Sequence, residues 1–132
     1  MSIDLDALLG KGFDSLYGLE ILEATPEYGR AQVRVRDELK QPFGLVHGGV
    51  YAAIAESLAS WCTGTAVFPE GKSASGLSNQ TSFLRPITTG TIHADAQVLH
   101  HGRTTWVWDV RISDDQGRLC AVTRMTVAVR DG

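Results

Sequence analysis

The sequence predicts an α+β domain in which an antiparallel sheet curls around one long central helix. One stretch, residues 48–68, has Glu56 as its only charged residue and is apolar or small on almost every helical face. Two segments with strand periodicity precede this stretch and four follow it. A helix that is apolar all round must be enclosed, and an antiparallel sheet offers one apolar face to enclose it. With 132 residues the chain has a common size for one folding unit, so we expect a single domain over residues 1–132.

The first third of the chain predicts a short helix and a β-hairpin. Residues 4–16 favour a helix capped by Asp4 or Ser2. The hairpin spans residues 18–37, where the arms GLEILEAT and RAQVRVRD flank the turn cluster Pro-Glu-Tyr-Gly at 26–29. The second arm has one buried side, because its apolar residues alternate with polar ones. These apolar residues are Ala31, Val33 and Val35.

The remaining elements follow from hydrophobic spacing and from turn residues. The central helix is indicated by apolar side chains at helical spacing, namely Val50, Ile54, Leu58 and Trp61. The cluster Pro-Glu-Gly-Lys at 69–72 ends this helix, and Asp-Asp-Gln-Gly at 114–117 is typical of a hairpin turn. Strands are predicted at 73–84, an unusually polar segment, and at 91–100, 104–113 and 118–130, where the alternation is clear.

Composition and charge exclude several classes of function. The net charge of −3 leaves no basic surface for nucleic acid or for an anionic membrane. Cys62 and Cys120 lie outside any CxxC spacing and the acidic N-terminus lacks the features of a signal peptide, so we expect a reduced, cytoplasmic compartment. The histidines lack the neighbours of a metal site, and the carboxylate of Glu56 argues against a membrane span at 48–68.

The start of the central helix is suited to binding an oxyanion. Gly48 and Gly49 open the helix, so its own turns leave their backbone N–H groups unpaired. The helix dipole favours negative charge at this end, and glycine lets a substrate approach the backbone closely. Donors placed this way can stabilise the oxyanion that forms when a carbonyl is attacked.

Glu56 lies about two turns further along the same helix. Its neighbours include several alanines, and we expect this apolar setting to raise the pKa of its carboxyl by desolvation. Ser60 follows one turn later and can orient the carboxylate by a hydrogen bond. Each of these residues alone has an ordinary structural explanation. Their concentration next to one helix start favours a site.

This segment resembles the hotdog-fold acyl-CoA thioesterases, in particular the Glu-dependent 4-hydroxybenzoyl-CoA thioesterases and the phenylacetate-pathway and enterobactin-associated thioesterases. The resemblance runs from residue 15 to the C-terminus and preserves the predicted order of strands and helix. Its most specific feature is the interval between Gly48 and Glu56. The other matching pieces are Gln41-Pro-Phe-Gly, His47-Gly48-Gly49, Ser57, Ser60, Gly76-Leu77, Arg85 and Gly117-Arg118-Leu119-Cys120.

The resemblance implies a role for each residue of the catalytic set. The N–H of Gly48, with His47 nearby, would polarise the thioester carbonyl. Glu56, contributed by the other subunit of a dimer, would act as nucleophile or as general base on water, and residue identities leave both roles open. Gln41 would place the substrate or the water, and Ser60 would orient Glu56 or the water.

The substrate-binding residues also follow from the resemblance. For coenzyme A the family uses groups on the strand after the helix and on the next hairpin, which correspond to Arg85 and to the loop residues Gly102, Arg103 and Thr104. The enterobactin-associated branch has a histidine two residues before the arginine that matches Arg85. Phe83 stands in that place, which indicates an apolar wall and a different substrate.

We therefore expect hydrolysis of an acyl- or aroyl-CoA thioester by a homodimer or homotetramer that needs neither a metal nor a bound cofactor. A hotdog dehydratase or hydratase is one alternative, since it also carries an acidic residue on the central helix, but it generally shows a different histidine motif. A non-catalytic acyl-CoA binding module is another, and we would expect it to lack a buried carboxylate. Release of free thiol from a panel of acyl-CoAs separates these alternatives.

Overall fold

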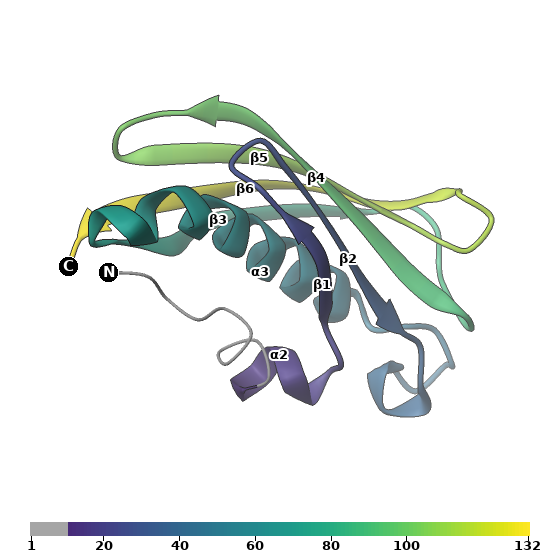
Figure 1. The fold of residues 1–132 in the computed structure, drawn as a ribbon. Coiled ribbons are helices and arrows are strands. Elements are labelled where there is room, and N and C mark those ends of the chain that lie inside the picture. The colour runs from purple at the N-terminus through teal and green to yellow at the C-terminus, as the bar shows by residue number, and fades with distance from the viewer. Residues whose placement is uncertain (1–10) are drawn as a thin grey trace.

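A computed structural model describes residues 11–132 and shows a six-stranded antiparallel sheet curled around one long helix (Figure 1). This confirms the predicted fold class. The elements in chain order are α2 (Gly12–Leu16), β1 (Glu20–Ala24), β2 (Tyr28–Arg34), the 3-10 turn η1 (Asp37–Leu39), α3 (Gly48–Val67), the 3-10 turn η2 (Phe68–Glu70), β3 (Lys72–Phe83), β4 (Thr91–His101), β5 (Thr105–Ser113) and β6 (Leu119–Asp131). Of the helix predicted at 4–16, the part from Gly12 is helical, and both capping candidates lie outside the described residues.

The sheet has the strand order β1-β2-β4-β5-β6-β3, so consecutive hairpins join β4, β5 and β6, and β3 lies at one edge. The alternation predicted for β5 is confirmed, because four of its side chains face the helix and are at most 1% exposed. They are Trp106, Trp108, Val110 and Ile112. The pairing of β3 with β6 runs from Lys72 to Phe83 and shifts register between Gly76 and Ser78.

Helix α3 lies along the concave face of the sheet (Figure 1). Its buried side includes Ile54, Leu58 and Cys62, each with no exposed surface. A buried polar pair also fixes the helix to the sheet: the Trp108 indole N–H donates to Thr63 Oγ1 at 2.9 Å, and the Thr63 hydroxyl donates to the Ala59 carbonyl at 2.8 Å. Two kinds of contact therefore orient α3 on the sheet: the burial of its apolar side chains and the hydrogen bond between Thr63 and Trp108.

The sheet covers only one side of α3, and this explains one error of the sequence prediction. Glu56 was expected to be enclosed, but its side chain is exposed in the single chain. It lies on the part of the helix that faces away from the apolar side chains of the sheet and towards the edge strand β3. No helix among residues 11–132 combines the length and the hydrophobicity that a membrane span requires.

Candidate active site

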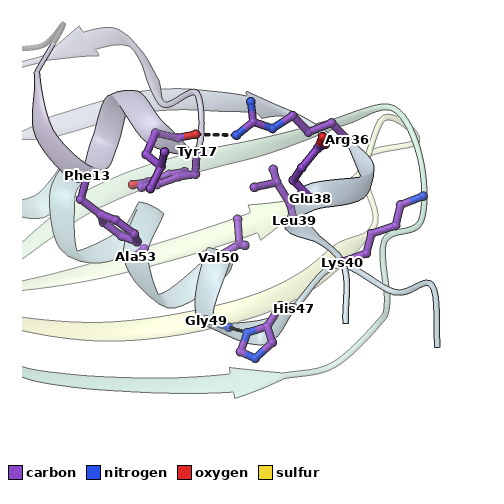
Figure 2. A pocket seen from close by; sticks show the side chains of 11 residues that line it. Phe13, Tyr17, Arg36, Glu38, Leu39, Lys40, His47, Gly49, Val50 and Ala53 are labelled. Carbon is purple, nitrogen blue, oxygen red and sulfur yellow. Dashed lines mark hydrogen bonds between the residues drawn. The ribbon is translucent and has the colours of Figure 1, made fainter. Parts of the chain in front are cut away.

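The start of α3 is capped by the histidine that precedes it. The backbone N–H of Gly49 donates to Nδ1 of His47 at 2.8 Å (Figure 2). The turns of the helix leave the Gly49 N–H unpaired, as expected, but the His47 cap occupies it and it is not available to a substrate. Because Nδ1 accepts this bond, the neutral imidazole carries its proton on Nε2. The side chain of His47 thus stabilises the helix start on which the predicted oxyanion site depends.

Gly48 keeps a free backbone donor. As the first residue of α3 it has no partner inside the helix, and none of the turn or capping bonds of residues 11–132 uses its N–H. It borders a pocket of about 480 Å³, and a Cβ added to Gly48 would lie 2.8 Å from Cε1 of Phe83. The pocket is lined by Gln41, Leu45, Val46, Gly48, Tyr51, Phe83, Leu84, Arg85 and Pro86.

Two further polar groups reach this pocket. Oε1 of Gln41 accepts from the backbone N–H of Phe43, so the NH₂ of Gln41 is the part of the amide that can donate to a bound molecule. The hydroxyl of Tyr51 accepts from the backbone N–H of Ile87 at 3.2 Å. Burial raises the pKa of Tyr51, so the hydroxyl keeps its proton at neutral pH. The sequence prediction missed Tyr51, although its place one turn after Gly48 puts it on the same helix face.

Glu56 borders a second hollow of about 470 Å³. Its carboxyl group lies over Gly76 of β3, where an added Cβ would be 3.2 Å from Cδ of Glu56. No hydrogen bond joins Ser60 to Glu56 within the described residues. Asn79, which the sequence prediction also missed, donates to the Ala52 carbonyl at 3.0 Å and ties β3 to α3 beside the carboxylate. The hollow is lined by Phe13, Ala52, Ala53, Glu56, Ser57 and Asn79.

The predicted catalytic residues fall into two separate groups within one chain. Gly48 and Glu56 are eight residues apart on α3 (56 − 48 = 8), which corresponds to a rise of about 12 Å and a rotation of about 80°. One thioester group cannot touch both positions. Gln41, Phe83 and Arg85 lie with Gly48, whereas Glu56 has its own hollow.

The predicted nucleotide-binding loop lies farther away. The carbonyl of Thr104 accepts from the N–H of Val129, which pairs with Ala74 on β3. Ala74 and Phe83 are nine residues apart on this strand (83 − 74 = 9), or about 30 Å. The loop therefore lies at the other end of β3 from Phe83 and the Gly48 pocket. At that end Lys72, Arg103 and Arg130 border another hollow. Residues 11–132 contain no group of three or more metal-ligating side chains.

Comparison with known proteins agrees with this geometry. The sequence model of the thioesterase superfamily matches residues 43–121, which include the helix start and the whole of α3. The chain belongs to the thioesterase superfamily. A Mycobacterium tuberculosis protein named as a candidate esterase is 43% identical over 114 residues, covering 83% of this chain and 79% of its own.

Two further relatives have names that state an activity, one a CoA-ester hydrolase and the other a thioesterase. The 1,4-dihydroxy-2-naphthoyl-CoA hydrolase of Listeria monocytogenes is 31% identical, over 90% of this chain and 96% of its own length. The crystal structure of a Haemophilus influenzae thioesterase superposes with a TM-score of 0.88 at 34% identity, covering 96% of this chain and 88% of that one. The chain is thus a thioester hydrolase with the hotdog fold.

Proposed function

We propose that this protein hydrolyses an acyl- or aroyl-CoA thioester as a homodimer, with each active site formed by Gly48 of one subunit and Glu56 of the partner subunit. The observation that supports this most directly is the separation of the two groups along α3. Each half lacks what the other supplies: a free N–H donor on one side and an exposed carboxylate on the other.

A two-fold axis brings the two halves together. Ala52 lies midway between Gly48 and Glu56, so two antiparallel copies of α3 that cross near Ala52 align residue 48 of one with residue 56 of the other. The edge strand β3 runs beside this part of the helix and its outer side has no partner strand among residues 11–132. Leu77 on β3 is 60% exposed. An unpaired edge of this length favours association with a second copy.

The chemistry follows from these positions. The thioester carbonyl oxygen accepts from the N–H of Gly48, which stabilises the negative charge that develops as the carbonyl is attacked. The carboxylate of Glu56 either removes a proton from the attacking water or attacks the carbonyl carbon itself to form an anhydride that water then cleaves. Both routes break the carbon–sulfur bond, release the thiol of coenzyme A and yield the free acid. Gln41 positions the substrate or the water through its NH₂ group, and Ser60 orients the carboxylate once the partner subunit is in place.

The substrate class is a coenzyme A ester. A relative that acts on such an ester, the Listeria hydrolase, supports this choice. Arg85 borders the Gly48 pocket and would contact the phosphate-bearing part of coenzyme A. In the dimer the loop Gly102-Arg103-Thr104 adds a basic surface for the nucleotide, together with nearby Lys72.

Thiol release from acetyl-, octanoyl-, benzoyl- and phenylacetyl-CoA tests the proposal. We expect Glu56→Ala to lower turnover by at least a hundredfold while substrate binding is retained, because a base or nucleophile acts on the chemical step. Glu20→Ala is the matched control, since it removes an exposed carboxylate on β1, outside the proposed site. Wild-type turnover in folded Glu56→Ala protein would show that another residue carries out the reaction. A single turnover in ¹⁸O-labelled water, followed by mass analysis of Glu56, identifies the nucleophile role if ¹⁸O enters the residue, because only cleavage of an anhydride at the Glu56 carboxyl carbon places water oxygen there.

A further inference from the structure

A cavity lies between α2, the segment 36–40 and the first turns of α3 (Figure 2). Its volume of about 600 Å³ is within the range of small-molecule sites. None of the roles proposed above uses this cavity. Its lining residues are Phe13, Leu16, Tyr17, Arg36, Glu38, Leu39, Lys40, His47, Gly49, Val50 and Ala53. We call it the α2 pocket.

The α2 pocket lies next to the hollow that Glu56 borders. Phe13 and Ala53 line both, so the two spaces meet at this pair of side chains. From Glu56 the pocket extends back along α3 past Ala53 and Val50 to Gly49, a rise of about 10 Å. Figure 2 shows Phe13 beside Ala53 at one end of the pocket and His47 with Gly49 at the other.

The lining is apolar where a ligand would lie, and the charged groups at the rim offset one another. The guanidinium of Arg36 donates to the Leu16 carbonyl (Figure 2). The ammonium of Lys40 pairs with Asp37 at 3.1 Å. Glu38 also lines the pocket, and its carboxylate offsets the charge of Arg36. The rim therefore has no net positive charge that would select an anionic ligand, and an uncharged apolar group fits best.

The wall of the pocket formed by α2 is held in place next to Glu56. The hydroxyl of Ser57 donates to Oδ1 of Asp14 at 2.6 Å, and the hydroxyl of Tyr17 donates to the same oxygen at 3.1 Å. Tyr17 is only 4% exposed, and burial raises its pKa, so it remains a donor at neutral pH. These bonds fix α2 to the residue that follows Glu56 and keep Phe13 at the junction.

We propose that the α2 pocket binds the apolar body of the acyl group, a medium-length aliphatic chain that runs from Glu56 along α3 towards Gly49. This inference rests on the proposed function, since it requires Glu56 to act on the thioester. The acyl chain and the carboxylate then belong to one subunit, whereas the N–H donor and the bound coenzyme A belong to the partner subunit. Ala53 and Phe13 set which acyl groups pass the junction, and Val50 limits their length.

The acyl-length dependence of kcat/KM tests this proposal on the full chain, with saturated acyl-CoAs from acetyl to palmitoyl. In wild-type protein we expect kcat/KM to rise about fourfold for each added methylene, the equivalent of about 0.8 kcal/mol, and to level off once the pocket is full. Ala53→Leu narrows the junction and should lower the octanoyl-to-acetyl ratio of kcat/KM at least tenfold. Ala66→Leu adds the same atoms to another half-buried alanine of α3 and should leave that ratio unchanged.

A second variant keeps the test decisive if Ala53→Leu fails to fold. Phe13 is 65% exposed, so Phe13→Ala should fold, widen the junction and raise the relative kcat/KM of branched and aromatic acyl groups. An unchanged acyl-length profile in both variants would overturn the proposal. If hydrolysis still depends on Glu56 in that case, only the assignment of the pocket fails. If Glu56→Ala retains full activity, the proposed function itself fails.

Discussion

Replacing Gly48 by alanine tests whether the backbone at the start of α3 binds the oxyanion. The variant keeps the N–H but adds a methyl group that would lie 2.8 Å from Cε1 and 3.0 Å from Cζ of Phe83. Contacts this close cannot persist, so either the Phe83 ring moves into the space of the substrate or the methyl occupies it. Phe83 is 58% exposed, so its ring can rotate. We therefore expect a destabilisation near the lower end of the roughly 1–3 kcal/mol that overpacking costs.

The effect on catalysis should be much larger than the effect on stability. A thioester held away from the N–H loses the oxyanion bond, and the loss of one such donor lowers kcat roughly 10²–10³-fold. Thiol release and thermal unfolding, measured on the same preparations, give both quantities. The double variant Gly48→Ala/Phe83→Ala removes the clash with the ring and should recover stability without recovering the rate. If its rate instead equals that of Phe83→Ala alone, the clash with the ring explains the loss, and the argument that the added methyl keeps the thioester away from this N–H is refuted.

Three further predictions concern the histidine cap, the buried polar pair and the assembly. His47→Ala should cost about 1 kcal/mol of unfolding free energy, because it removes an N-cap, and His47→Asn should recover most of it. The effect of His47→Ala on hydrolysis should be milder than that of Gly48→Ala. If folded His47→Ala protein does not hydrolyse the thioester, the imidazole is the principal catalytic group at the helix start. Thr63→Val leaves the Trp108 N–H unpaired in the core and should cost about 1–3 kcal/mol in denaturant unfolding, whereas Thr63→Ser keeps the hydroxyl and should lose less. Light scattering combined with assays should show that activity requires at least a dimer, and an active monomer at micromolar concentration would contradict the shared site.

The sequence predicted the strands and the central helix well because their periodicities differ clearly. Trp106 and Trp108 are buried and alternate with the half-buried Thr105, Val107 and Asp109, as expected for a sheet with one apolar face. Even the polar strand β3 was located correctly. Its composition has a physical reason: β3 lies at the sheet edge, and most of its side chains remain exposed.

Contacts between distant segments were beyond the reach of sequence patterns. The bond from Ser57 to Asp14 joins residues that are 43 positions apart, and nothing in either segment indicates that they pair. Tyr51 is a similar case, because its hydroxyl meets the backbone N–H of Ile87, 36 positions further along the chain. Periodicity shows which face of an element is buried but does not show which partner it meets.

The exposure of Glu56 is an instructive error, because the sequence argument behind it is wrong for one chain and would hold in the proposed dimer. A carboxylate among alanines on an otherwise uncharged helix does indicate a surface that is to be covered. The sheet of the same chain covers only the side of α3 that carries Ile54, Leu58 and Cys62. The small residues beside Glu56 then leave room for a second helix to approach closely. The interval of eight residues between Gly48 and Glu56 supports the same conclusion. It is too long for both to contact one carbonyl from a single helix, and it suits two antiparallel helices that cross midway between them. The spacing that identified the site in the sequence is therefore itself an argument for the dimer.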